Sequence, residues 1–182
     1  AGREVRDGGG VSPDIEVKQE RLPNILFYLV RDNLIFDYAT DYCLKHPAIA
    51  SAKEFELTDA DYEEFKNKVK GADFKYDQQS EKILNTLKEA AEFEGYMKDA
   101  SDEFKALENK LKHNLDRDLD YFSKDIKKMI AEEIIKRYYY QEGAIIQQLK
   151  DDKDLDEAVK VLTNPERYQQ ILSVTAVTAK KE

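Results

Sequence analysis

Serine and lysine residues are the first candidates for chemistry in this chain, because a lysine can serve as the base for a nucleophilic serine. Ser51 begins a Ser-Ala-Lys-Glu segment, and Lys75 follows it within segment 71–77. Such a pair needs a lysine whose pKa is lowered by burial and donors that stabilise an oxyanion. Segment 71–77 predicts neither, since Asp73 and Asp77 flank Lys75 and favour its charged form. We therefore predict that the chain has no catalytic residues.

Metal-binding patterns are also weak. If a calcium loop is counted from Asp152, Glu157 stands where the loop needs glycine and Thr163 where it needs a bidentate glutamate. The favoured alternative is a helix start with acidic residues at the positive end of the helix dipole. His46 and His113 do not form a His-Glu-x-x-His motif. We expect neither a metal nor a cofactor.

Two further features have competing interpretations. Cys43 lies in an apolar helix, which favours core packing over reactivity, and a lone cysteine cannot form a disulfide within a monomer. The run Tyr138, Tyr139 and Tyr140 could be a binding surface, since tyrosine is enriched at interaction hot spots. However, successive helical residues point in different directions, which favours one buried ring with the others at the edge of the core.

Helices must position these residues, because the pattern after residue 18 is helical almost throughout. One helix is predicted from Pro23 to about Lys45, and a second is capped by Thr58 and ends at Gly71. A third begins at residue 77 or 80 and stops or bends near Gly95. Its residues expected to face inward are Ile83, Leu84, Leu87 and Ala91.

The longest pattern lies in the second half of the chain. Apolar residues recur there every three or four positions: Phe104, Leu107, Leu111, Leu115, Leu119, Phe122, Ile126, Ile130, Ile134 and Tyr138. No glycine or proline interrupts the pattern before Gly143, so we predict one helix over about 101–140, which would be roughly 60 Å long. Short helices are expected at 155–162 and from Asn164-Pro165 onwards.

A helix of this length either carries shorter helices along its side or pairs with another chain. The candidate interface residues are therefore apolar or aromatic: Leu119, Phe122, Ile126, Tyr138, Tyr139 and Tyr140. For this stripe we favour internal core at the centre and intermolecular contact towards one end.

The first seventeen residues differ from the rest. Three glycines, a serine and a proline lie between Val5 and the alternating Ile15 and Val17, a pattern that predicts strand, tight turn and strand over about 3–18. The unpaired edges of such a hairpin tend to recruit another chain or the sheet of a larger protein. We therefore expect residues 1–18 to be the end of another domain and the chain to be part of a longer protein.

This segment resembles the closing hairpin of the catalytic domain of the carboxyl-terminal processing, or tail-specific, serine peptidases. The resemblance is carried by Gly2, Arg3, Gly9, Gly10, Val11, Pro13, Asp14 and Ile15. Further along, 132–143 and 154–162 resemble the helical tail of the same family as found in Bacteroidetes-type bacteria.

The resemblance implies a periplasmic or cell-envelope parent that uses a serine-lysine dyad and trims proteins near their C-termini. In that family the dyad precedes the hairpin, whereas Ser51 follows it, so the fragment itself would be non-catalytic. Its role would be to brace the peptidase core, to form a homodimer, or to receive a protein substrate or adaptor. Two alternatives are an independent helical interaction module without a proteolytic parent and, least favoured, a fragment that is itself a hydrolase.

Composition sets outer limits on these interpretations. The chain has 182 residues, of which 37% are charged, and its net charge of -9 opposes binding to nucleic acid. The most apolar stretch, 22–39, is interrupted by charges and is too short for a membrane span. We predict a mainly α-helical module with three parts: 1–18 at the end of the peptidase core, 19–175 as the helical domain, and 176–182 as a frayed tail.

Overall fold

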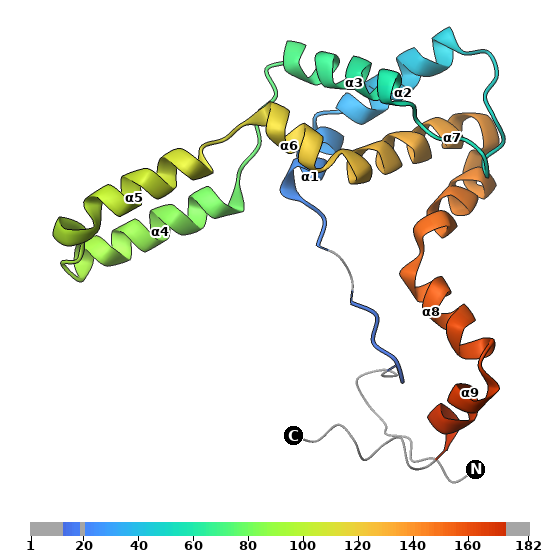
Figure 1. Ribbon diagram of the computed structural model, residues 1–182. Helices are drawn as coiled ribbons and strands as arrows, with labels where there is room; N and C mark the ends of the chain where they lie inside the picture. Colours follow the sequence, from blue (N-terminus) through green and yellow to red (C-terminus); the bar gives the residue numbers. More distant parts are fainter. Residues whose placement is uncertain (1–12, 19–20, 174–182) are drawn as a thin grey trace. The chain divides into compact units, whose positions relative to one another are not determined.

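Helices dominate the structure, a computed structural model that describes residues 13–18 and 21–173 (Figure 1). The prediction of a mainly helical fold is confirmed. The chain divides into two compact units, one of residues 21–147 and the other of residues 1–20 with 148–182.

The helices have the following bounds within the described residues. The larger unit contains α1 (Asn24–Arg31), α2 (Leu34–Lys45), α3 (Asp59–Gly71), α4 (Gln79–Phe93), α5 (Met97–Leu111), α6 (Leu115–Tyr121) and nearly all of α7 (Ser123–Gln148). The smaller unit contains the 3-10 turn η1 (Leu149–Asp151), α8 (Lys153–Leu162) and α9 (Pro165–Leu172).

The predicted β-hairpin over 3–18 is not supported. Pro13 and Asp14 belong to the described segment 13–18, which contains no strand, while Gly2, Arg3, Gly9 and Gly10 lie outside the described residues. A two-stranded hairpin is at best marginally stable by itself, because it lacks a partner sheet or helix to cover it. The tail predicted to fray, 176–182, also lies outside the described residues.

The helix predicted from Pro23 to Lys45 is two helices. Asn33 separates α1 from α2 with a left-handed backbone, φ 59° and ψ 13°, which asparagine adopts more readily than most residues. The apolar pattern runs through this break because residues on both sides are buried, among them Leu29 and Leu34. Periodicity alone therefore did not reveal the turn.

The predicted single helix over 101–140 is wrong. Residues 112–114 separate α5 from α6, and Phe122 separates α6 from α7. Asn114 causes the first break, because its side chain accepts a hydrogen bond from the backbone N–H of Arg117 at 3.0 Å and so begins a new helix. An asparagine cap needs neither glycine nor proline, which explains why the apolar stripe looked continuous.

Helix α3 matches its prediction closely. Thr58 and Asp61 form a capping box in which each side chain accepts from the backbone N–H of the other residue. The predicted inward residues Tyr62, Phe65 and Val69 are all buried. This face packs into the core of the larger unit.

The core of the larger unit is formed by α1, α2, α3, α6, the first part of α7 and the loop 52–57. Its fully buried side chains, each with less than 2% of its surface exposed, include Ile25, Leu29, Phe65, Val69, Leu119, Ile126, Ile130, Ile134 and Ile135. The phenol of Tyr62 donates to the backbone oxygen of Leu119 at 2.6 Å and ties α3 to α6. Lys66 reinforces the same contact, because its ammonium donates to Asp120 at 2.6 Å and to Glu63 at 2.8 Å.

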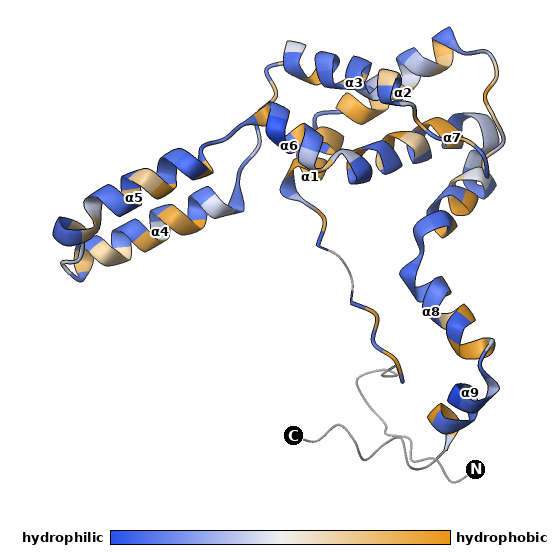
Figure 2. Ribbon diagram, viewed as in Figure 1, coloured by the Kyte–Doolittle hydropathy of each residue, from blue (hydrophilic) through white to orange (hydrophobic). Residues whose placement is uncertain are grey.

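Helices α4 and α5 form a separate helical hairpin. They pack on each other, and none of their residues belongs to the core cluster. Leu84 and Ala91 are buried as predicted, but Ile83 and Leu87 are more than half exposed. Figure 2 shows hydrophobic residues along both helices of this pair.

Candidate functional site

The serine and lysine candidates do not form a catalytic pair. The hydroxyl of Ser51 is exposed and donates to the carboxylate of Glu54 at 2.7 Å. The ammonium of Lys75 donates to Asp73 at 3.0 Å, and the lysine side chain is 80% exposed. A base for serine needs a buried, neutral amine, and Lys75 has an exposed, paired one.

Metal-ligating side chains are not clustered in the part of the chain that the structure describes, where no group of three or more could hold an ion. Asp152, from which the calcium loop was counted, caps α8 by accepting from two backbone N–H groups at 2.9 Å. The favoured helix-start interpretation therefore agrees with the structure. His46 stacks on Tyr42 with ring centroids 4.0 Å apart, and His113 lies on Tyr76 at 4.4 Å. Within the described ranges, no helix is long and apolar enough to cross a bilayer.

The tyrosine run is divided between structural and exposed positions. Tyr138 donates to the backbone oxygen of His46, and Tyr139 donates to that of Ala50 at 3.1 Å. Both phenols therefore fasten α7 to the loop that follows α2. Tyr140 makes no such contact in the described structure and is 79% exposed. Of the three rings, Tyr140 is the one with most surface available to a partner.

The remaining interface candidates lie in or against the core. Leu119 and Ile126 have no exposed surface, and Phe122 packs against the core cluster while half-buried. These three side chains occupy the centre of the predicted stripe, where internal packing was favoured. One end of the stripe lies on α5, where Leu107 is 42% exposed.

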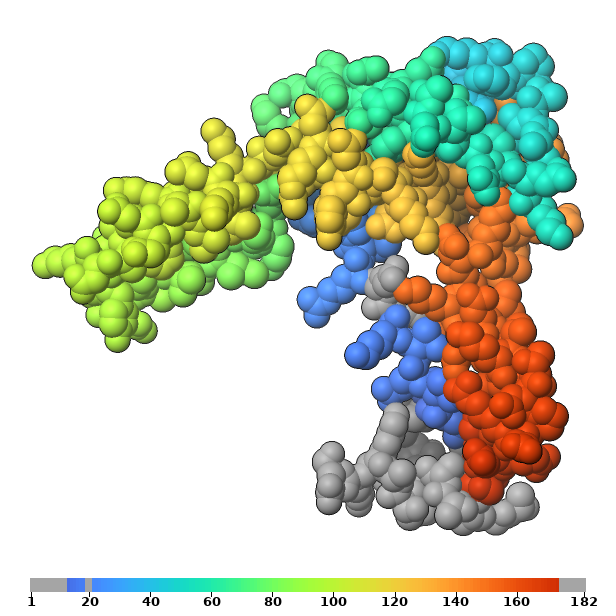
Figure 3. Space-filling view, viewed as in Figure 1, coloured from blue at the N-terminus to red at the C-terminus, as the bar shows by residue number. Residues whose placement is uncertain are grey.

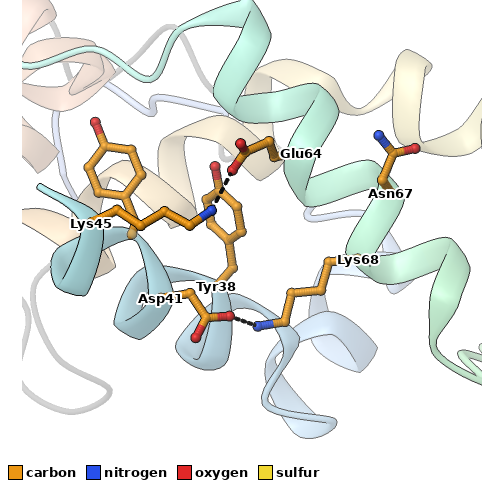
Figure 4. Close-up of a pocket in the computed structure, with 7 residues that line it drawn as sticks. Tyr38, Asp41, Lys45, Glu64, Asn67 and Lys68 are labelled. Carbon is orange, nitrogen blue, oxygen red and sulfur yellow. Dashed lines mark hydrogen bonds and ion pairs between the residues drawn. The ribbon is translucent and has the colours of Figure 1, made fainter.

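A small pocket of about 270 Å³ lies between α2 and α3 (Figure 4). Its charged residues are already paired, since Lys68 donates to Asp41 at 2.6 Å and Lys45 donates to Glu64 at 3.2 Å. The hydrogen bond from Lys68 lowers the pKa of Asp41. These pairs hold α2 against α3 and leave no uncompensated charge among them to attract a ligand, so we assign the pocket a structural role.

Asp118 is a buried carboxylate that the sequence analysis missed. It is only 4% exposed and accepts hydrogen bonds from the Tyr76 hydroxyl at 2.6 Å, the Gln78 amide at 2.8 Å and the Arg117 guanidinium at 2.8 Å. Burial, together with this hydrogen bond, raises the pKa of Tyr76. Asp118 thus joins the segment before α4 to the helix after α5 and anchors both ends of the α4–α5 hairpin.

The sequence contained one signal for Asp118. Asn114 is followed by acidic residues at 116 and 118, a pattern typical of a helix start. Tyr76 and Gln78, which donate to Asp118, are 42 and 40 residues away from it in the sequence. No local pattern connects such distant residues.

An apolar groove of about 380 Å³ lies in the smaller unit. Its lining combines the N-terminal segment with the last two helices: Asp14, Ile15, Val17, Asp154, Glu157, Ala158, Val161, Leu162, Tyr168, Ile171 and Leu172. Figure 3 shows the blue atoms of residues 13–18 lying against the orange and red atoms of α8 and α9. Ile15 and Val17 are half-buried.

The two helices of this groove are well defined locally. Asn164 caps α9 by accepting from the backbone N–H of Arg167 at 3.0 Å, and Pro165 occupies the first turn. The Arg167 guanidinium donates to Glu157 at 2.5 Å, links α9 to α8 and lowers the pKa of that carboxyl. The groove therefore has a fixed pair of helices on one side.

Comparison with known proteins agrees with the coarser part of the sequence resemblance. A family model described as "Probable PDZ-protease, C-terminal helical domain" matches residues 25–162, which is more than half of the chain. The matched residues run from the first turn of α1 to the last residue of α8. No curated protein and no solved structure matches the chain. The chain therefore belongs to the family of C-terminal helical domains of probable PDZ-proteases.

Proposed function

We propose that this chain is the non-catalytic C-terminal domain of a periplasmic carboxyl-terminal processing serine protease. The family match supports a protease parent, and the resemblance of Gly2 to Ile15 to the closing hairpin of that peptidase domain supports the finer assignment. The parent's serine and its lysine base would precede residue 1. The alternative of an interaction module without a proteolytic parent gains nothing from the family match.

Within the parent, we assign the domain the role of bracing the peptidase core. The observation that carries this role is a shared groove. Asp14, Ile15 and Val17, which would lead out of the core, line it together with α8 and α9. The last helices of the domain would thus hold the chain where the domain begins. Such a contact between the two ends of the domain would limit how far the domain can move relative to the peptidase core.

The parentage is tested by the reading frame upstream of Ala1. We expect a Ser-Ala-x-Glu segment followed by a Gly-Lys-Gly turn, the elements of the dyad in the resembled family. An unrelated domain at that place would contradict the assignment.

The brace is tested by limited trypsin digestion of the full chain. Trypsin cleaves after Lys18 and Arg21, next to the residues in the groove. Ile171→Asp places a charge in the apolar groove and should speed cleavage at these sites several-fold. The matched control is Gln169→Asp, because Gln169 is exposed and does not line the groove. Equal cleavage rates for the two variants would contradict the brace.

A second proposed role is homodimerisation through the α4–α5 hairpin. The support is apolar surface on a helical pair that contributes nothing to the core cluster: Ile83 is 59% exposed, Leu87 51%, Phe93 93% and Tyr96 63%. Leu107, near the exposed end of the predicted stripe, adds to this surface. Two such hairpins can cover each other as a four-helix bundle, which buries apolar faces of this kind.

Sedimentation mass separates this role from that of an adaptor site. We expect a dimer that Leu87→Asp shifts towards the monomer, whereas Leu44→Asp should leave the mass unchanged. Leu44 is also exposed, at 81%, but lies on α2. A monomer at high concentration would contradict dimerisation and leave the hairpin surface to a substrate or adaptor.

A further inference from the structure

Tyr140 has a non-helical backbone conformation inside α7. Its φ is 54° and its ψ is -151°, although α7 continues on both sides of it. This region of backbone space is essentially restricted to glycine, because a Cβ atom is crowded there. Asn33 is the other described non-glycine residue with positive φ, and asparagine tolerates its left-handed conformation. No comparable preference explains Tyr140.

Gly143 shows how sharply α7 bends at this point. A Cβ built on Gly143 would lie 2.3 Å from the Cβ of Tyr139 and 2.9 Å from Cγ2 of Ile135. In a straight α-helix, Cβ atoms four residues apart are about 5–6 Å from each other, and residues eight apart are separated by about 12 Å along the axis. The bend therefore requires glycine at position 143.

Gln147 adds an independent observation on the same segment. Its side chain is only 7% exposed, and its Oε1 atom has no hydrogen-bond partner among the residues that the structure describes. Buried acceptors nearly always have a hydrogen-bond partner, so the position of the Gln147 oxygen is energetically unfavourable. Two unfavourable features, the backbone of Tyr140 and the unpaired oxygen of Gln147, thus lie on either side of the sharp bend at Gly143.

We propose that α7 is a two-state helix, which is kinked at Tyr140 in this structure and can straighten through residues 123–148. Straightening returns Tyr140 to helical backbone angles and separates Gly143 from Tyr139. We expect straightening also to expose the Gln147 amide to water. The kinked state is held by the burial of Gly143 and Ala144, which is 3% exposed.

Straightening of α7 would affect the chain that follows residue 148. Straightening changes the direction in which the chain leaves residue 148 towards α8, so contacts made by the rest of a longer protein can select one state over the other. The inference concerns α7 alone and does not depend on the proposed function.

Two substitutions should drive the equilibrium in opposite directions. Gly143→Ala excludes the kinked state, because the added methyl group has no room, and it favours a regular helix. Tyr140→Gly favours the kinked state, because glycine accepts positive φ freely. Nitroxide labels at Lys124 and Ile145, in a Cys43→Ser background, report the distance across the bend.

A straight helix places those two backbone positions about 32 Å apart, from 21 steps of 1.5 Å. We expect mainly shorter distances in the parent sequence, a shift towards 32 Å in Gly143→Ala, and only the shorter distances in Tyr140→Gly. A Gly143→Ala chain that keeps both the short distance and its native melting temperature would overturn the proposal.

Melting temperatures provide a second test that does not require the Gly143→Ala chain to fold. The matched control is Lys136→Gly, which places a glycine at an exposed, regular position of α7. Lys136→Gly should lower the melting temperature, since glycine weakens a regular helix, while Tyr140→Gly should raise it. An equal decrease in the two variants would show that Tyr140 is not strained and would overturn the proposal.

Discussion

At the scale of single residues, several polar side chains of this domain connect segments that are far apart in the sequence. Asp118 collects three hydrogen-bond donors in a site that is almost closed to water. Ser51 and Lys75, the residues with the most catalytic potential by type, are exposed and bound to nearby carboxylates.

Removing the Asp118 carboxylate should destabilise the domain. Asp118→Ala leaves the Tyr76 hydroxyl and the Gln78 amide without their acceptor, at a cost of about 1–3 kcal/mol in the free energy of unfolding. Asp116→Ala is the control, because this side chain is 65% exposed and pairs only with Lys70 at the surface. Chemical denaturation measures both, and equal small losses would contradict the role of Asp118.

Buried tyrosines should make the domain sensitive to alkali. Burial raises the pKa of Tyr38 and Tyr62 above the ordinary value of 10.0, so both stay protonated in the folded state where the unfolded chain has lost its protons. Their contribution to stability is complete below pH 10 and is lost as the pH rises above that value.

Tyr62→Phe provides the check, because phenylalanine cannot titrate. We expect the free energy of unfolding of Tyr62→Phe to fall less steeply than that of the parent sequence between about pH 9 and pH 11, the range in which a phenol titrates. Identical slopes in the two proteins would show that Tyr62 does not contribute to the alkaline loss.

At the scale of elements, side-chain caps fix where α3, α6, α8 and α9 begin. Thr58 and Asp61 begin α3, while Asn114, Asp152 and Asn164 begin three later helices. Where a cap coincided with a visible change in periodicity, as at Thr58, the helix could be predicted. Where the apolar pattern continued across the cap, as at Asn114, it could not.

Asn33 shows one limit of sequence prediction. This residue interrupts a helix through positive φ, and the surrounding periodicity continues because both sides of the break contribute buried residues. Tyr76 and Gln78, two of the partners of Asp118, are 42 and 40 residues away, so only tertiary packing brings them to it. The helical class, in contrast, followed from local patterns.

The capping box of α3 should be measurable by one substitution. Thr58→Ala removes the acceptor for the Asp61 N–H and should cost about 1 kcal/mol of unfolding free energy. Thr86→Ala is the matched control, since Thr86 lies inside α4, is exposed, and bonds only to a carbonyl of its own helix. Alanine is the better helix former there, so that variant should be neutral or slightly stabilised. Losses of similar size in both proteins would contradict the cap.

At the scale of the whole molecule, the two compact units correspond to two proposed tasks. The larger unit has its own core and presents the α4–α5 hairpin, while the smaller unit gathers residues 14–17 with α8 and α9. The family match spans the larger unit and ends with α8. This organisation is compatible with the two roles proposed above, the brace for the smaller unit and the dimer contact for the α4–α5 hairpin.

We propose that the proteolytic activity of the parent protein does not lie on this chain. The most direct measurement incubates the purified chain with an unstructured protein substrate and a serine-directed acylating probe. The account predicts neither cleavage nor labelling, because Ser51 lacks a buried lysine base. Cleavage and labelling that both disappear in Ser51→Ala would contradict it.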